Sequence, residues 1–194
     1  RAGRGDVGIE RACGFGRVRE NGVTRQVALL RGVNLGKRQV VMAELRAVLE
    51  DAGFEDVRTL LASGNVVLSS KLKGAKLETK LEAVILGGLG LKTDVFVRDA
   101  DQLDAVIAGN PFKAFTKANS TFMVVQFMRA PASKAELETI AKTALLGEEA
   151  KQGDGCLYIK FPNGQGPSKL KTPKLATARN WNTVLKLAAA VRAE

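Results

Sequence analysis

The strongest constraint on the fold is a pattern of apolar residues that runs from residue 25 to residue 98. Short β-prone runs alternate there with apolar stripes at helical spacing, in the order strand, helix, strand, strand, helix, strand. The expected strands are 26–30, 57–62, 66–69 and 93–98, and the expected helices carry Met42, Leu45, Val48 and Leu49, then Leu77, Leu81, Val84 and Ile85. This is the order of the split ferredoxin-like unit.

The second half of the chain nearly repeats this order. We expect a short helix at 103–107, a strand at 121–128, a helix at 137–141, a hairpin of 148–152 and 156–161, and a last helix at 181–192. The sequence therefore predicts an α+β protein of two tandem ferredoxin-like (α/β-plait) modules with antiparallel sheets, at residues 25–99 and 100–194.

Residues 1–24 differ in composition from the rest of the chain. They contain six glycines and five arginines and show no sustained helical or strand period. Such a segment cannot bury enough apolar surface to offset the entropy lost on ordering. We expect it to be a disordered or non-native N-terminal extension outside the fold.

Several residue types that catalysis or metal binding commonly uses are scarce. The chain has no histidine, which excludes Ser-His and Cys-His nucleophile pairs and histidine metal sites. Two cysteines, Cys13 and Cys156, are too few for a disulfide framework or a zinc site, and we expect Cys156 to be buried and inert. No apolar run approaches the ~18 residues of a membrane span. We expect a cytoplasmic protein with no metal, no cofactor and no membrane partner, and the sequence leaves open whether it is an enzyme.

The basic residues are concentrated at one end of the chain. The formal net charge is +10, and residues 160–194 hold seven basic residues and a single acidic one. A local basic cluster is typical of proteins with an anionic partner, such as a phosphate, a nucleic acid or an acidic protein. The alternative is a solvated surface that promotes solubility.

A specific RNA-binding sheet is disfavoured. RNA recognition on a ferredoxin-like sheet normally uses aromatic side chains on the two central strands. The expected central strands of the first module, 26–30 and 66–69, contain none. Sequence-independent binding of a nucleic-acid backbone by the basic C-terminal end stays open.

The first candidate site combines the glycine-bearing loop 31–38 with the turn 63–65. Strands one and three are antiparallel neighbours in the expected sheet, so the end of the first lies beside the beginning of the third. This brings Asn34, Lys37 and Arg38 close to Ser63 and Asn65, and Arg31, which begins the loop, belongs to the same candidate site. Backbone amides and basic side chains could hold a phosphate or carboxylate there, although the spacing is not that of a P-loop. The alternative is a tight turn whose Asn and Ser side chains satisfy backbone groups.

The second candidate is a basic loop that contains Ser168 and Lys169. Its glycine-flanked, lysine-rich sequence predicts a ligand-binding loop. Ser168 and Lys171 also have the Ser-x-x-Lys spacing of a serine nucleophile, but the Lys-Thr-Gly element that accompanies this motif has only a near match here. We therefore do not expect a catalytic serine.

The third candidate is the segment around Arg179, Asn180 and Asn182. Asn180 is a good N-cap for the last helix, whose first amides could then meet an anion. Arg179 could reach the same point. Trp181 lies at the helix start, where we expect it to pack against the body of the protein rather than stack on a ligand.

These motifs together resemble a known family, the bacterial domain of unknown function 1697. The matching stretches are Leu29-Leu30-Arg31-Gly32-Val33-Asn34, Met42-Ala43-Glu44-Leu45-Arg46, Ala62-Ser63-Gly64-Asn65-Val66-Val67, Asn110-Pro111-Phe112, Ser168-Lys169-Leu170 and Arg179-Asn180-Trp181-Asn182-Thr183-Val184. The resemblance extends from about Thr24 to Val191 and implies two ferredoxin-like modules. It implies no established activity, substrate or cofactor.

Three functions are compatible with these patterns. The preferred hypothesis is binding of an anionic ligand (a nucleotide, a phosphorylated metabolite or a nucleic-acid backbone) at loops joining the two modules. The first alternative is a histidine-free enzyme acting on a phosphorylated or acidic small molecule, with Lys37 or Lys169 as base or charge clamp. The second is a protein-interaction module whose polar turns are structural. The oligomeric state is open.

Overall fold

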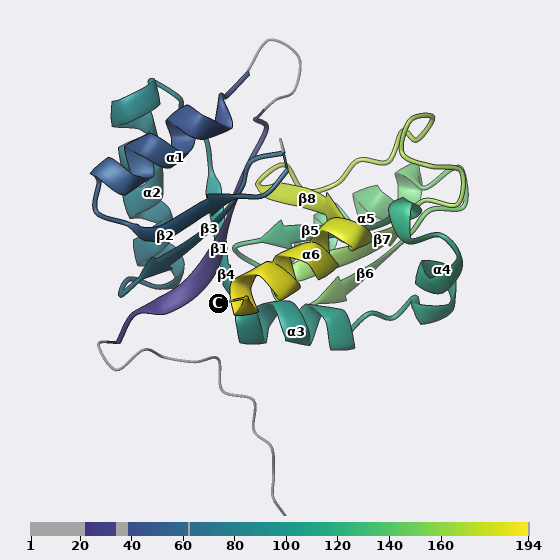
Figure 1. Ribbon diagram of the computed structural model, residues 1–194. Helices are drawn as coiled ribbons and strands as arrows, with labels where there is room; N and C mark the ends of the chain where they lie inside the picture. The colour runs from purple at the N-terminus through teal and green to yellow at the C-terminus, as the bar shows by residue number, and fades with distance from the viewer. Residues whose placement is uncertain (1–21, 34–38, 62, 194) are drawn as a thin grey trace, which may run out of the picture.

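The computed structural model describes residues 22–33, 39–61 and 63–193, which form an α+β protein with two four-stranded antiparallel sheets (Figure 1). The first sheet has the strand order β2-β3-β1-β4. Its strands are β1 (Thr24–Leu30), β2 (Glu55–Thr59), β3 (Asn65–Ser70) and β4 (Val95–Asp99). Its helices are α1 (Met42–Asp51) and α2 (Gly74–Leu89).

The second sheet has the equivalent strand order β6-β7-β5-β8. Its strands are β5 (Met123–Met128), β6 (Glu149–Gly153), β7 (Cys156–Lys160) and β8 (Ala176–Asn180). The helices of this half are α3 (Ala100–Ala108), α4 (Lys113–Ala118), α5 (Lys134–Thr143) and α6 (Trp181–Arg192), with a 3₁₀ turn at Ser120–Phe122.

The two halves share one central core. The inner faces of both sheets pack together with α3 and α6, and α6 contacts strands of both sheets (Figure 1). This core includes Val27 and Phe96 from the first sheet, Phe127 from the second, and Trp181 and Leu187 from α6. Trp181 is therefore a core residue, as the sequence predicts. Two smaller cores lie on the outer faces, one under α1 and α2 and the other against α5.

The structure agrees with the expected element order over residues 24–99 and adds a strand, β8, and a short helix, α4, in the second half. The segment 176–180 is β8, an edge strand that the sequence pattern does not indicate. The crossover from β7 to β8, residues 161–175, contains no helix. The predicted N-terminal extension lies outside the described residues up to position 21, and β1 begins at Thr24.

Corresponding backbone contacts relate the two halves. The N–H of Leu30, at the end of β1, donates to the carbonyl oxygen of Gly64 at 2.8 Å, and the N–H of Met128, at the end of β5, donates to that of Gly155 at 3.0 Å. Both glycines have positive φ, 70° and 61°, and both stand at the turn before the third strand of their sheet. A Cβ on Gly64 would lie 2.2 Å from a methyl carbon of Val33, so this turn also requires glycine for space.

Candidate functional site

Arg179 of β8 crosses from the second half of the protein into the first. Its side chain is buried at the turn between β2 and β3. Its guanidinium donates to Asn65 Oδ1, to the Thr177 hydroxyl (2.8 Å) and to the carbonyl oxygens of Leu30 (3.0 Å), Ser63 (3.0 Å), Gly64 (3.3 Å) and Ala178 (2.8 Å). Arg179 is therefore brought together with the candidate residues Ser63 and Asn65, although more than a hundred residues separate it from them in the chain.

Arg98 of β4 makes the reciprocal crossing. Its guanidinium donates to the carbonyl oxygens of Met128 at 2.6 Å and Gly155 at 2.9 Å, the counterparts of Leu30 and Gly64. It also donates to the carbonyl of its own neighbour, Val97, at 2.7 Å. Each sheet thus sends an arginine from its fourth strand to the end of the first strand of the other sheet.

The electrostatic surroundings of the two arginines differ. Burial lowers the pKa of Arg98, while the nearby carboxylates of Glu78, Asp154 and Asp99 act in the opposite direction. Burial alone lowers the pKa of Arg179 to about 10, with no carboxylate among its contacts. The acceptors around Arg179 are all neutral, so no described residue in contact with it compensates its positive charge.

Ser63 and Asn65 hold the turn around this arginine. The Asn65 side-chain amide donates to the Leu60 carbonyl at 2.9 Å and to Ser63 Oγ at 2.8 Å, and its oxygen accepts from Arg179. Asn65 is fully buried. Both oxygen and nitrogen of its side chain are therefore occupied within the protein, and Asn65 shapes the site rather than facing solvent.

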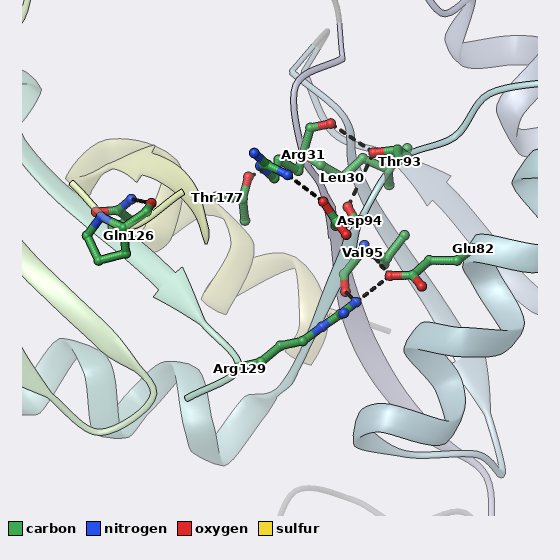
Figure 2. Close-up of polar contacts among 10 residues, drawn as sticks. Leu30, Arg31, Glu82, Thr93, Asp94, Val95, Gln126, Arg129 and Thr177 are labelled. Carbon is green, nitrogen blue, oxygen red and sulfur yellow. Dashed lines mark hydrogen bonds and ion pairs between the residues drawn. The ribbon is translucent and has the colours of Figure 1, made fainter. Parts of the chain in front are cut away.

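Arg31 follows β1 and lies at the surface beside this turn. It forms a half-exposed ion pair with Asp94, at 2.5 Å between Nη1 and Oδ2, and the Thr93 hydroxyl donates to its carbonyl oxygen at 2.8 Å (Figure 2). Arg31 lines an open groove of about 620 Å³ between α2 and the start of β4. Lys92 contributes a second cation to that groove, and Glu82 and Asp94 contribute carboxylates.

The remaining predicted site residues are distributed over other places. Asn34 and Lys37 lie outside the described residues. Asn180 caps α6 by accepting from the Thr183 N–H at 2.9 Å, as the sequence predicts, and Asn182 is half-buried in the first turn of that helix.

Ser168 and Lys169 are not part of the Arg179 cluster. The Ser168 hydroxyl donates to the Glu148 carboxylate, and the Leu170 N–H donates to Ser168 Oγ at 3.1 Å. Leu170 packs against the core on the outer face of the second sheet, whereas Arg179 belongs to the inner side. Lys169 is exposed. Ser168 therefore anchors the β7–β8 crossover.

The basic C-terminal cluster does not form one continuous surface. Lys160 pairs with Glu149 at 2.6 Å, Arg192 pairs with Asp104, and Arg179 is buried. Lys169, Lys171, Lys174 and Lys186 are exposed.

The sequence analysis did not single out Arg98 or Arg129. The same local pattern occurs in both halves: an edge strand ends with an arginine followed by Asp or Asn, and that second residue is the N-cap of the next helix. The two pairs are Arg98-Asp99 and Arg179-Asn180. This repeated pattern could have indicated that the two arginines are related.

The thiol of Cys156 is buried, and burial raises its pKa to about 11, in keeping with the expected inert side chain.

The protein is thus of the α+β class, and two reciprocal arginines and a shared core join its two antiparallel sheets within one chain. The chain belongs to the family described as "Protein of unknown function (DUF1697)", whose model matches residues 23–158. The conserved bacterial protein SP0830 from Streptococcus pneumoniae, a solved structure, is similar to it, with 26% sequence identity and a TM-score of 0.68. The similarity covers 88% of this chain and 99% of that one. The search of curated proteins found no match.

Two further features can be stated for the described part of the chain. None of its helices is long and apolar enough to cross a membrane. No group of three or more cysteine and acidic side chains in it could hold a metal ion.

Proposed function

We propose that this protein binds an anionic ligand, such as a nucleotide, a phosphorylated metabolite or a nucleic-acid backbone, at the surface over Arg31 and the turn 63–65. The observation that carries the proposal is the buried Arg179 guanidinium, which has only neutral acceptors. A charge that its contacts leave uncompensated in a low-dielectric setting produces a positive potential at the nearest surface. Arg31 and Lys92 lie in the adjoining groove and can contact a bound phosphate or carboxylate directly.

We also propose a fold type for each half of the protein and a cellular location. Each half has ferredoxin-like strand order, which supports two ferredoxin-like modules, and the second differs by a β7–β8 crossover without a helix. The proposed location is the bacterial cytoplasm; the free thiol of Cys156 is compatible with it.

The test is a thermal-shift screen of the whole chain against nucleotides, phosphorylated metabolites and short DNA and RNA, at low and high salt. A ligand at 100 times its dissociation constant should stabilise the protein by about 2.7 kcal/mol. A salt-resistant shift from one small molecule indicates a defined phosphate site, whereas a shift from nucleic acid that disappears at high salt indicates backbone binding.

A matched pair of variants then locates the site. Arg31→Gln should abolish the shift, and Arg46→Gln, which removes the same charge from α1, should retain it. The proposal fails if no anion shifts the melting temperature, or if the two variants respond alike.

A further inference from the structure

The free edges of the two sheets are closed to different degrees. β4 is an edge strand, and its outward N–H groups are covered by α2. The N–H of Val95 donates to the Glu82 carboxylate, and that of Val97 donates to the Glu78 carboxylate, both at 2.9 Å. Glu78 and Glu82 are four residues apart, so one face of α2 presents both carboxylates to the strand.

An arginine from the other half completes the closure of β4. Arg129 follows β5 and forms an ion pair with Glu78 at 3.0 Å. It also pairs with Glu82 and donates to the Val95 carbonyl at 3.0 Å (Figure 2). Two carboxylates and one arginine thus satisfy three outward backbone groups. An edge covered in this way cannot pair with another chain.

β8 occupies the corresponding edge of the second sheet. The outward Ala178 carbonyl accepts from the Arg179 guanidinium at 2.8 Å, but the outward N–H groups lack the cover that α2 gives to β4. Because the Met128 N–H points toward β7, that of Phe127 points toward β8, where Phe127 is paired with Thr177. The N–H groups of Ala176 and Ala178 therefore point outward, and no acceptor for either is found in residues 22–33, 39–61 and 63–193. Ala178 is exposed.

The difference follows from the two crossovers. α2 leads into β4 and supplies the two glutamates, whereas the crossover into β8 is the helix-free segment 161–175. The arginine of the arrangement is still present, because Arg31 stands one residue after Leu30 as Arg129 stands one residue after Met128. Figure 2 shows its guanidinium on the side of Asp94 that faces Thr177. The second edge thus has the N–H groups and the arginine, which pairs with Asp94, but no carboxylate that accepts from those N–H groups among the described residues.

The charge around β8 indicates which partner fits. Residues 161–193, which include β8, contain no aspartate or glutamate, and their lysines are all exposed: Lys169, Lys171, Lys174 and Lys186. We infer that the free edge of β8, together with Arg31, docks an acidic helix of a partner protein that presents two carboxylates one turn apart. These carboxylates take the places at Ala176 and Ala178 that Glu82 and Glu78 take at Val95 and Val97. A second copy of β8 has no acidic residue to offer Arg31.

The test uses a synthetic helical peptide, held in helical form by a side-chain lactam, with glutamates at positions i and i+4 of its free face. The control peptide has glutamines at those two positions. Binding to the whole chain is measured by fluorescence polarisation, and hydrogen exchange follows the Ala176 and Ala178 amides. We expect both amides to exchange rapidly in the free protein and slowly in the complex, and the glutamate peptide to bind roughly tenfold more tightly than the glutamine peptide.

Three variants locate the interaction. Arg31→Gln should remove the preference for glutamate, and Arg46→Gln should retain it. Ala176→Pro removes one outward N–H without breaking a ladder bond, since proline is tolerated at the first residue of an edge strand, and Ala176 makes no hydrogen bond with Arg179. It should weaken peptide binding roughly tenfold and leave the response to small anions unchanged. The docking edge and the proposed ligand site can therefore fail independently.

The inference is overturned if millimolar glutamate peptide does not bind, if it protects α2 and β4 instead, or if both peptides bind equally. Slow exchange of the Ala178 amide in the free protein would show that the edge is already covered. Protection that rises with protein concentration without peptide would identify a second copy as the occupant and would also overturn the inference.

Discussion

Arg98 and Arg179 occupy equivalent places in the two halves of this protein but have different surroundings. Each leaves the fourth strand of its own sheet and donates to the carbonyl at the end of the other sheet's first strand. Arg98 has carboxylates nearby and lies 5.5 Å from the Phe127 ring centre, whereas Arg179 is held by neutral oxygens, including that of Asn65. The two arginines thus have the same backbone acceptors in equivalent positions. Arg179 differs from Arg98 because no carboxylate among the described residues compensates its charge, and this difference marks the candidate site.

The largest difference between the two positions should appear when each arginine is removed. Arg179→Leu leaves the Ser63 carbonyl and the Asn65 amide oxygen without this donor, and leaves the Leu30 carbonyl with the Thr177 hydroxyl at 3.3 Å. It should lower the free energy of unfolding by about 3–5 kcal/mol. Arg98→Leu should cost about 2–3 kcal/mol, because fewer acceptors depend on it. Urea unfolding followed by circular dichroism measures both losses. Equal losses would show that the extra acceptors of Arg179 contribute nothing to stability.

The shared core gives a second comparison, between inner and outer packing. Leu187→Ala in α6 should cost about 3–4 kcal/mol, and Ile140→Ala in α5 about 2–3 kcal/mol. The distribution of faster hydrogen exchange over the two sheets is more informative than the size of the stability loss. Hydrogen exchange should accelerate in both sheets for Leu187→Ala, because α6 contacts both, but mainly in the second sheet for Ile140→Ala. Acceleration confined to one sheet in the Leu187 variant would contradict a common core.

Asn65 and Cys156 hold equivalent positions at the start of β3 and β7 and provide a smaller contrast. Asn65→Ala removes the acceptor of Arg179 and two donors, and should cost about 2 kcal/mol. Cys156→Ala should cost about 1 kcal/mol, the value of lost packing alone. Chemical denaturation of the two variants under the same conditions compares their free energies of unfolding. A larger loss of stability for Cys156→Ala than for Asn65→Ala would contradict this prediction.

The smallest effect concerns Ser168, which sequence analysis assigned to a ligand loop. Its hydrogen bond lowers the pKa of Glu148, so the contribution of this bond to stability is present at neutral pH and is lost as the pH falls through the folded-state value. Ser168→Ala should raise the pKa of Glu148 and make stability less sensitive to acid. Carbon-13 NMR titration measures the pKa of Glu148. Urea midpoints at pH 7 and about pH 4 measure how strongly stability depends on acid. An unchanged pKa would exclude the bond in solution.

The sequence predicts the regular elements better than their contacts. Apolar spacing identifies the first four strands and two helices because each buries one face. β8 is missed because Ala-Thr-Ala-Arg-Asn has little strand propensity, and pairing with β5 decides its conformation. Antiparallel pairing of strands one and three correctly places the end of β1 beside the turn before β3, where the Leu30 N–H donates to the Gly64 carbonyl. The reciprocal crossing of Arg98 and Arg179 depends on how two sheets pack, which no local pattern encodes.

The common core has a consequence for how the chain could be divided. Each sheet has an inner face that is covered only when the other half is in place. Either half produced alone would expose this face, and the sites that accept its neighbour's arginine would be empty. The continuous backbone keeps the two faces at high effective concentration, so an association that would depend on dilution between separate chains becomes independent of it. The protein is in this sense a tethered heterodimer whose partners are always present in equal number.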